Sequence, residues 1–195
     1  MMQTLSTLKT IPKIDEDKFT SIFGMIIVIA SLSMLFVALI VCYSILRVRS
    51  GFWVNLNIEG SYLFIAYFNT VMILISSFTY FKWSKSIRNN SKDIPLKWIN
   101  TTILIGLIFL LIQLNLWYSL SNSGLQLTTS QASAVFYLLS GLHGLHIIAG
   151  IIALVWIKRK VQVLDINFTH VRITGMFWHF LSVVWIAIFI SVILI

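Results

Sequence analysis

The sequence predicts an all-α protein, a polytopic membrane bundle of five transmembrane helices, and three observations support this. Apolar and aromatic residues make up 58% of the 195 positions and charged residues only 10%, whereas soluble domains carry about 25% charged residues. The mean hydropathy is +0.94. The apolar residues are gathered into five runs of roughly 20 to 26 residues, long enough to cross a hydrocarbon core about 30 Å thick.

The first two runs end at basic residues. Residues 21–46 form the first predicted span, which Arg47 and Arg49 close. A turn-like stretch rich in Ser, Gly and Asn then leads to the second predicted span, residues 61–82. We expect this helix to continue beyond the lipid until a polar segment that contains Pro95 breaks it.

The other three runs complete the bundle. The third predicted span, residues 98–120, carries Gln, Asn, Trp and Tyr toward its end, as is typical near a membrane interface. The fourth, residues 133–157, stops at the basic residues 158–160, and the fifth, residues 173–195, ends the chain. We therefore expect residues 1–195 to form a single transmembrane domain.

The distribution of Lys and Arg predicts the orientation. There are three in the N-terminal tail, five between the second and third spans and four between the fourth and fifth, which makes 12 on one side against Arg47 and Arg49 on the other. Because cytoplasmic segments carry the excess of Lys and Arg, we expect the N-terminus inside and the C-terminus outside. Charge placed between hydrophobic runs sets orientation, so the net charge of +8 does not indicate nucleic acid binding.

Few side chains in the predicted spans could perform chemistry. The spans contain no Asp or Glu, and their Lys and Arg stay at the ends, so an ion transporter or proton pump, which needs an intramembrane acid, is not expected. Cys42 is the only cysteine, which excludes a thiolate metal cage and an internal disulfide. A small transporter stays open as a third hypothesis, although the few glycines in the spans fit helix packing equally well.

Small and polar residues share one face on each of the last two spans. At 100° per residue, the small and polar residues of the fourth span fall within an arc of about 120° around the helix axis, and His146 lies to one side of this arc. Those of the fifth span fall within a narrower arc. Such faces are typical of helix packing in membranes, and two deep tryptophans of the fifth span fit packing better than cofactor stacking. The predicted interface with helices, subunits or lipid comprises Ser140, His143, Gly144, His146, Gly150, Gly175, Trp178, His179, Ser182 and Trp185.

The three histidines of the last two spans fit two interpretations. In the first, His143, His146 and His179 are hydrogen-bonded between helices or to the backbone and hold the bundle together, and the chain has no catalytic, metal or cofactor-binding residue. In the second, one histidine of the fourth span and His179 are axial ligands of a b-type haem in the membrane anchor of a redox complex. His143 and His146 are too close together for two stacked haems. A Soret band at stoichiometric haem would favour the second interpretation.

Three segments resemble subunit III of the haem-copper oxidases, the cytochrome c and quinol oxidases. The stretches Phe136–Gly150, with the pattern FYxxxGxHGxHxxxG, and Gly175–Trp185, GMFWHFLSVVW, are similar to the last two helices of that family. The stretch Gly24–Phe36, followed by Tyr43 and Arg47, is similar to its first common helix. Five spans instead of seven resembles the shorter bacterial members.

The resemblance implies a non-catalytic subunit of a respiratory terminal oxidase in the bacterial inner (plasma) membrane, where oxygen reduction is coupled to proton pumping. It implies haem and copper in the partner subunits and none in this chain, contact with subunits I and II, bound phospholipid, and support of proton uptake. Leu32 stands where many members carry a glutamate and Ser182 where many carry an aspartate, so roles built on those acids do not carry over. The electron donor, cytochrome c or quinol, stays open.

Overall fold

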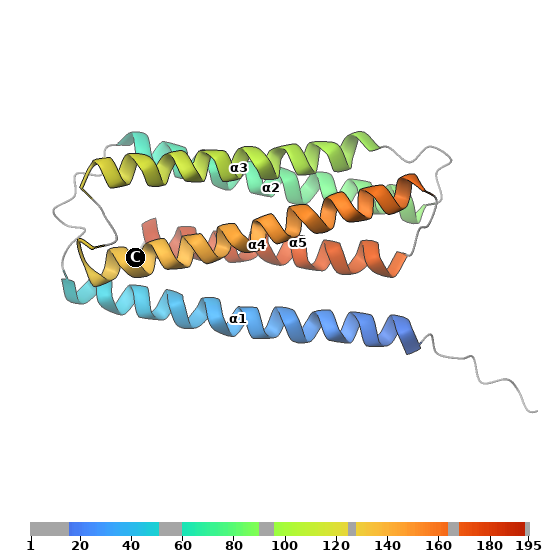
Figure 1. Ribbon diagram of the computed structural model, residues 1–195, viewed down its shortest axis with the longest axis horizontal. Helices are drawn as coiled ribbons and strands as arrows, with labels where there is room; N and C mark the ends of the chain where they lie inside the picture. Colours follow the sequence, from blue (N-terminus) through green and yellow to red (C-terminus); the bar gives the residue numbers. More distant parts are fainter. Residues whose placement is uncertain (1–15, 51–59, 90–95, 125–127, 164–167, 194–195) are drawn as a thin grey trace, which may run out of the picture.

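The computed structural model describes residues 16–50, 60–89, 96–124, 128–163 and 168–193. These residues form α1 (Glu16–Ser50), α2 (Gly60–Arg88), α3 (Leu96–Asn122), α4 (Gln131–Gln162) and α5 (Phe168–Ile193). All five helices contain stretches long and apolar enough to cross a membrane, and no strand occurs in the described part of the chain. The predicted all-α fold with five membrane-spanning helices is therefore confirmed (Figure 1).

The helices are longer than the predicted spans because polar residues at their ends continue the backbone hydrogen bonding. α5, for example, starts at Phe168, five residues before the predicted span. α4 begins with a capping box, in which the hydroxyl of Ser130 accepts from the backbone N–H of Ser133 and the hydroxyl of Ser133 accepts from the N–H of Ser130, both at 3.0 Å. This reciprocal pair satisfies two amides at the start of the helix.

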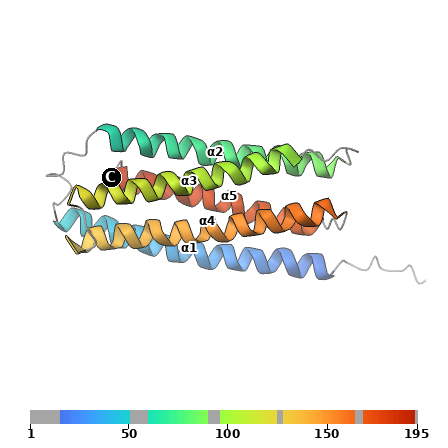
Figure 2. The same ribbon diagram turned by 45° about the horizontal axis from the view of Figure 1, so that its top comes forward.

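The five helices form one bundle in which α5 has the most central place. α4 and α5 lie between α1 on one side and the α2–α3 pair on the other (Figures 1 and 2). α5 contacts α1, α2 and α4, and α3 packs against α2 and α4. Half of the most apolar window of α5 is buried within the bundle, compared with 6% for α1, so α1 keeps most of its apolar surface for lipid or for another protein.

The main core lies where α2, α3, α4 and α5 meet, and a smaller one joins α1 to α4 and α5. The main cluster is dominated by the large buried rings Tyr80, Trp83, Phe109, Trp178 and Trp185. The smaller cluster consists of Phe36, Leu139, Val184 and Ile188. These two clusters hold the histidine-bearing faces of α4 and α5 inside the bundle.

Candidate functional site

His143 lies in the middle of α4, fully buried within a cage of aromatic rings. Its ring stacks on Trp185 of α5 at 5.4 Å, and it meets Phe109 of α3 and Phe36 of α1 edge-on at 6.2 and 6.1 Å between centroids. Neither ring nitrogen has a hydrogen-bond partner among the described residues. The prediction of a hydrogen bond is therefore wrong for His143. Aromatic rings from three helices surround the imidazole, and packing against these rings holds it in place.

The other polar side chains of this face bond within their own helix. Nδ1 of His146 lies 2.7 Å from the carbonyl oxygen of Leu142, to which the protonated nitrogen donates, and the hydroxyl of Ser140 donates to the carbonyl of Phe136 at 2.7 Å. A side chain added at Gly144 would meet only Leu110, at 4.0 Å. His146 thus bonds to the backbone, one of the two expected modes, and Gly144 is not at a close helix contact.

His179 faces α2. Its Nδ1 is hydrogen-bonded to the hydroxyl of Ser77, and its ring meets Tyr80 edge-on at 5.8 Å. One turn earlier, a Cβ at Gly175 would lie 2.6 Å from a carbon of the Tyr80 ring, so only glycine leaves room for this tyrosine in its present place. The Tyr80 hydroxyl donates to the carbonyl of Val171 at 2.7 Å. The bond expected between helices is thus present at His179, and the face that carries it packs against α2.

Trp178 joins three helices by filling the space left by two glycines. A Cβ at Gly150 of α4 would lie 3.0 Å from two atoms of the indole ring, and a Cβ at Gly106 of α3 would lie 3.0 Å from a third. The ring is 1% exposed. Gly106 was missed at the sequence level; its only signal is that it is the single glycine of the third hydrophobic run.

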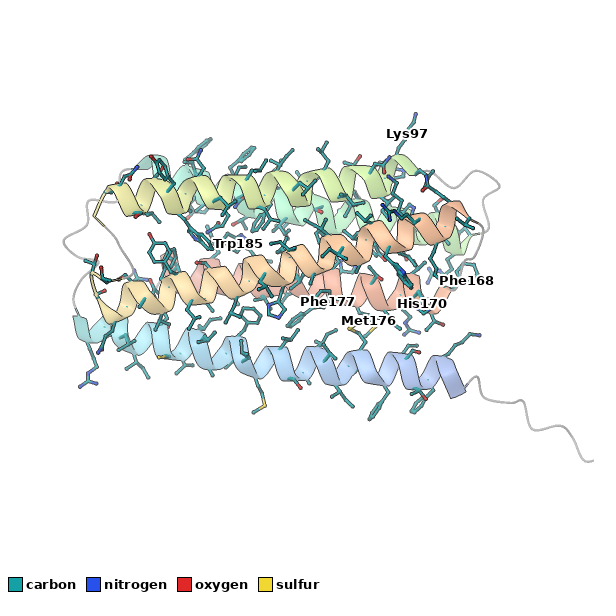
Figure 3. The ribbon with its side chains drawn as sticks, in the orientation of Figure 1. Lys97, Phe168, His170, Met176, Phe177 and Trp185 are labelled. Atoms are coloured by element: carbon teal, nitrogen blue, oxygen red, sulfur yellow. The ribbon has the colours of Figure 1, made fainter. Side chains whose placement is uncertain are left out.

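Trp185 occupies the middle of the bundle (Figure 3). Besides stacking on His143, its indole ring lies edge-on to Phe109 at 4.8 Å, and its N–H donates to the hydroxyl of Thr70 on α2 at 3.1 Å. Ser182, also buried, donates to the carbonyl of Trp178 at 3.2 Å. Both tryptophans predicted to serve packing thus lie between helices.

The structure does not bring the histidines together as a ligand set. His143 is enclosed by rings of α1, α3 and α5, whereas His179 is bonded to α2. No group of three or more His, Cys, Asp or Glu suited to a metal ion occurs among the described residues. His143 and His146 both meet Phe36 of α1 edge-on, and His179 meets Tyr80 of α2. The three rings thus make contacts between helices, and no geometry on these faces favours the haem-anchor interpretation.

Comparison with known proteins finds sequence similarity that extends through all five helices. The family model described as cytochrome c oxidase subunit III matches residues 18–195. A cytochrome c oxidase subunit 3 of Synechocystis is 31% identical, over 87% of this chain and 73% of its own length. A probable cytochrome c oxidase subunit 3 of Mycobacterium leprae is 29% identical, over 97% of this chain and 96% of its own length. A cytochrome bo(3) ubiquinol oxidase subunit 3 of Pseudomonas aeruginosa is 30% identical, over 62% of this chain and 59% of its own length.

Proposed function

Since this chain belongs to the cytochrome c oxidase subunit III family, we propose that it stabilises subunit I of a bacterial respiratory oxidase, in a complex that also contains subunit II. It is a multi-pass bacterial membrane protein and a non-catalytic subunit. In the proposed complex, haem and copper belong to the partner subunits. The observation that carries the proposal is the family match over residues 18–195, which includes nearly the whole of all five helices.

The outer surface of the bundle is suited to such a partner. α1 exposes a series of large apolar side chains along its length, among them Phe23, Met34 and Val41. In a membrane, such a surface is covered either by lipid or by another helix through close packing. We propose that it contributes to the interface with subunit I and to bound phospholipid, and that the complex uses this support during proton uptake.

Support of proton uptake would have to proceed without two acids that are common in the family. Leu32 is half-buried on α1, and the Ser182 hydroxyl is bonded to the backbone of its own helix. Neither position offers a carboxylate. We therefore propose that this chain acts through the stability of its partner and the surrounding lipid and does not itself relay protons through the membrane.

Affinity purification tests the proposal. The tagged chain, extracted in mild detergent, should retain a large haem- and copper-bearing subunit, and the chain stripped of that subunit should show no Soret band. Because apolar contacts between helices do not weaken with ionic strength, the complex should survive high salt at constant detergent. Release by salt would contradict the interface, and a haem spectrum from the isolated chain would promote the haem-anchor alternative.

We also propose that the end of the bundle carrying Lys97 and Phe168 faces the cytoplasm (Figure 3). The proposal rests on the 12-to-2 distribution of Lys and Arg. With Cys42 replaced by Ser, single cysteines introduced as Ser91→Cys and Ser123→Cys should react with impermeant reagents added on opposite sides of the membrane. Reaction from the same side would refute the orientation.

A further inference from the structure

α2 and α5 enclose a groove of about 530 Å³, whose lining extends from Arg88, the last residue of α2, to His179 near the middle of α5. This volume lies within the range of about 300–1,000 Å³ typical of ligand pockets. Much of the wall is apolar or aromatic, with Phe81 on α2 and Phe168 and Met176 on α5; the last two are labelled in Figure 3. The groove therefore suits a small molecule that dissolves in the membrane.

The imidazole of His179 offers this groove a free ring nitrogen. Its Nδ1 is hydrogen-bonded to the hydroxyl of Ser77, whereas its Nε2 has no hydrogen-bond partner among the described residues. Unlike the two ring nitrogens of His143, this atom is not sealed within the core. Histidines inside membrane-spanning helices are costly and mark functional sites by default, so a polar group of a ligand is the partner that the structure leaves room for.

The bond between His179 and Ser77 decides what the free nitrogen can do. When the Ser77 hydroxyl donates to Nδ1, Nε2 carries the proton and acts as a donor. When Nδ1 donates to the hydroxyl, Nε2 acts as an acceptor. A hydroxyl group can take either part. The site can therefore bond to a carbonyl oxygen in one arrangement and to a hydroxyl group in the other.

The charged side chains of the groove lie away from His179. Arg88 ends α2, and Arg172 lies seven residues before His179 on α5, which is about 10 Å along the helix axis. Both arginines are exposed, so they would hold a charged headgroup at the edge of the membrane. Near His179 the wall consists of Met176 and the ring of Tyr80, which meets the imidazole edge-on at 5.8 Å. This inner part of the groove favours a neutral, flat head with an oxygen atom at its rim.

We propose that the inner part of this groove binds the ring of a membrane-soluble quinone, with one ring oxygen hydrogen-bonded to Nε2 of His179 and the apolar tail along Phe81 and Phe168. The oxidised ring presents a carbonyl and the reduced ring a hydroxyl, and the two arrangements of the bond to Ser77 match one form each. The inference concerns binding alone. It goes beyond the proposed function, because it needs only the membrane setting of this chain and no partner subunit.

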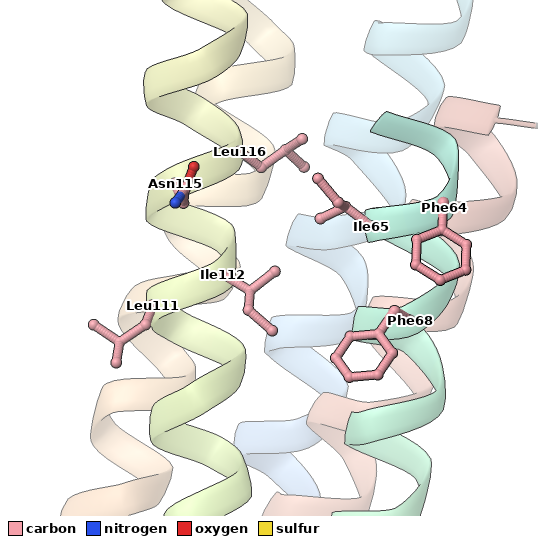
Figure 4. Close-up of a pocket in the computed structure, with 7 residues that line it drawn as sticks. All are labelled: Phe64, Ile65, Phe68, Leu111, Ile112, Asn115 and Leu116. Atoms are coloured by element: carbon pink, nitrogen blue, oxygen red, sulfur yellow. The ribbon is translucent and has the colours of Figure 1, made fainter. Parts of the chain in front are cut away.

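A second groove, of about 350 Å³ between α2 and α3, serves as a comparison (Figure 4). Asn115 supplies the one polar side chain of its lining, beside apolar residues such as Phe68 and Leu111. The side-chain oxygen of Asn115 already accepts from the hydroxyl of Ser119 at 3.4 Å. The groove at His179 is therefore the better match for a quinone, and Asn115→Leu tests the alternative place.

Native mass spectrometry of the full chain in mild detergent can test this inference. The protein is titrated with decylubiquinone, or with decylbenzene, which has the same tail on a ring without oxygen atoms. We expect decylubiquinone to form a one-to-one adduct, retained about tenfold more tightly than decylbenzene, because one hydrogen bond is worth about this factor. His179→Phe keeps an aromatic ring but no nitrogen, and it should remove about this preference.

Ser77→Ala is the matched control for His179→Phe. It breaks the same hydrogen bond between α2 and α5 but keeps the imidazole, so it should retain most of the quinone binding. Met176→Trp should fill the groove and abolish the adduct while His179 stays, which keeps the test valid if His179→Phe fails to fold. Asn115→Leu should leave binding unchanged. Circular dichroism checks the helix content of each variant.

Several outcomes would overturn the assignment. Equal retention of decylubiquinone and decylbenzene would show that the ring oxygens make no bond. An equal loss of binding in Ser77→Ala and His179→Phe would show that the imidazole acts only through the packing of the helices. An unchanged adduct in Met176→Trp, or its loss in Asn115→Leu, would move the quinone out of this groove.

Discussion

Replacing Gly150 with Ala tests whether Trp178 is fixed between α3 and α4. The added Cβ would lie 3.0 Å from two ring atoms of Trp178 and 3.1 Å from a methyl of Leu181. The ring has little room to withdraw toward α3, because there it already packs so closely on the backbone of Gly106 that even an added Cβ would lie only 3.0 Å from it. We therefore expect the substitution to strain the centre of the bundle.

The magnitude follows from two opposing effects. Overpacking a close-packed core costs about 1–3 kcal/mol, whereas Gly→Ala within a helix contributes about 1 kcal/mol of stability. Gly144→Ala on the same helix is the matched control, because its Cβ would meet only Leu110, at 4.0 Å. Gly144→Ala gains the higher helix propensity of alanine without overpacking the core. Gly150→Ala should therefore be less stable than Gly144→Ala by about 1–3 kcal/mol.

Thermal unfolding in one detergent, followed by circular dichroism, measures this difference. For a chain of this length, about 2–4 °C in the midpoint corresponds to 1 kcal/mol. Adding Trp178→Phe to Gly150→Ala removes part of the ring that the new methyl meets, so Gly150→Ala should cost less in that background than in the natural one. Equal midpoints for the two alanine variants, or an equal cost of Gly150→Ala in both backgrounds, would refute the packing argument.

Two further predictions concern polar ties between helices. Arg47→Gln should destabilise the bundle by about 1.5–3 kcal/mol, because its guanidinium donates to two carbonyls at the end of α5 at 2.8 and 3.1 Å; Arg49→Gln, at an exposed position, should leave the midpoint unchanged. His179→Phe should lose about 1 kcal/mol with the bond to Ser77, whereas His143→Phe breaks no hydrogen bond. In both histidine variants the assembled oxidase should keep its haem spectrum and most of its initial rate of oxygen consumption, and loss of haem while this subunit stays bound would contradict a packing role.

The number and type of the helices could be predicted from the sequence because the bilayer imposes a simple length requirement. A run of about 20 apolar residues has few other stable solutions in lipid. The ends of the helices were less predictable, as the start of α5 at Phe168 illustrates. Hydrophobicity reports where the lipid ends, whereas a helix continues as long as its backbone amides find partners.

The contacts of each face could not be predicted, since they depend on the rotation and order of the helices. Periodicity placed Gly175 and His179 on one face, but nothing in the sequence indicated that this face meets α2. The tie between Arg47 and the end of α5 joins residues more than 140 positions apart. A hydrogen bond was expected at His143 because a buried imidazole usually has one; the three rings around it come from helices whose arrangement no local pattern encodes.

The helices of this bundle are joined in two different ways, and the difference decides which substitutions matter. α2 is tied to its neighbours by polar bonds: the Ser76 hydroxyl donates to the carbonyl of Thr102 on α3, and Tyr80 and Ser77 bond to α5. On α4, by contrast, the central His143 makes no hydrogen bond among the described residues, and Gly150 admits the Trp178 ring. Loss of a polar group should therefore loosen α2, which is also tightly packed where Tyr80 meets Gly175. α4 should respond mainly to changes of side-chain volume, because a gap of about 0.5–1 Å already removes a quarter to a half of a dispersion contact.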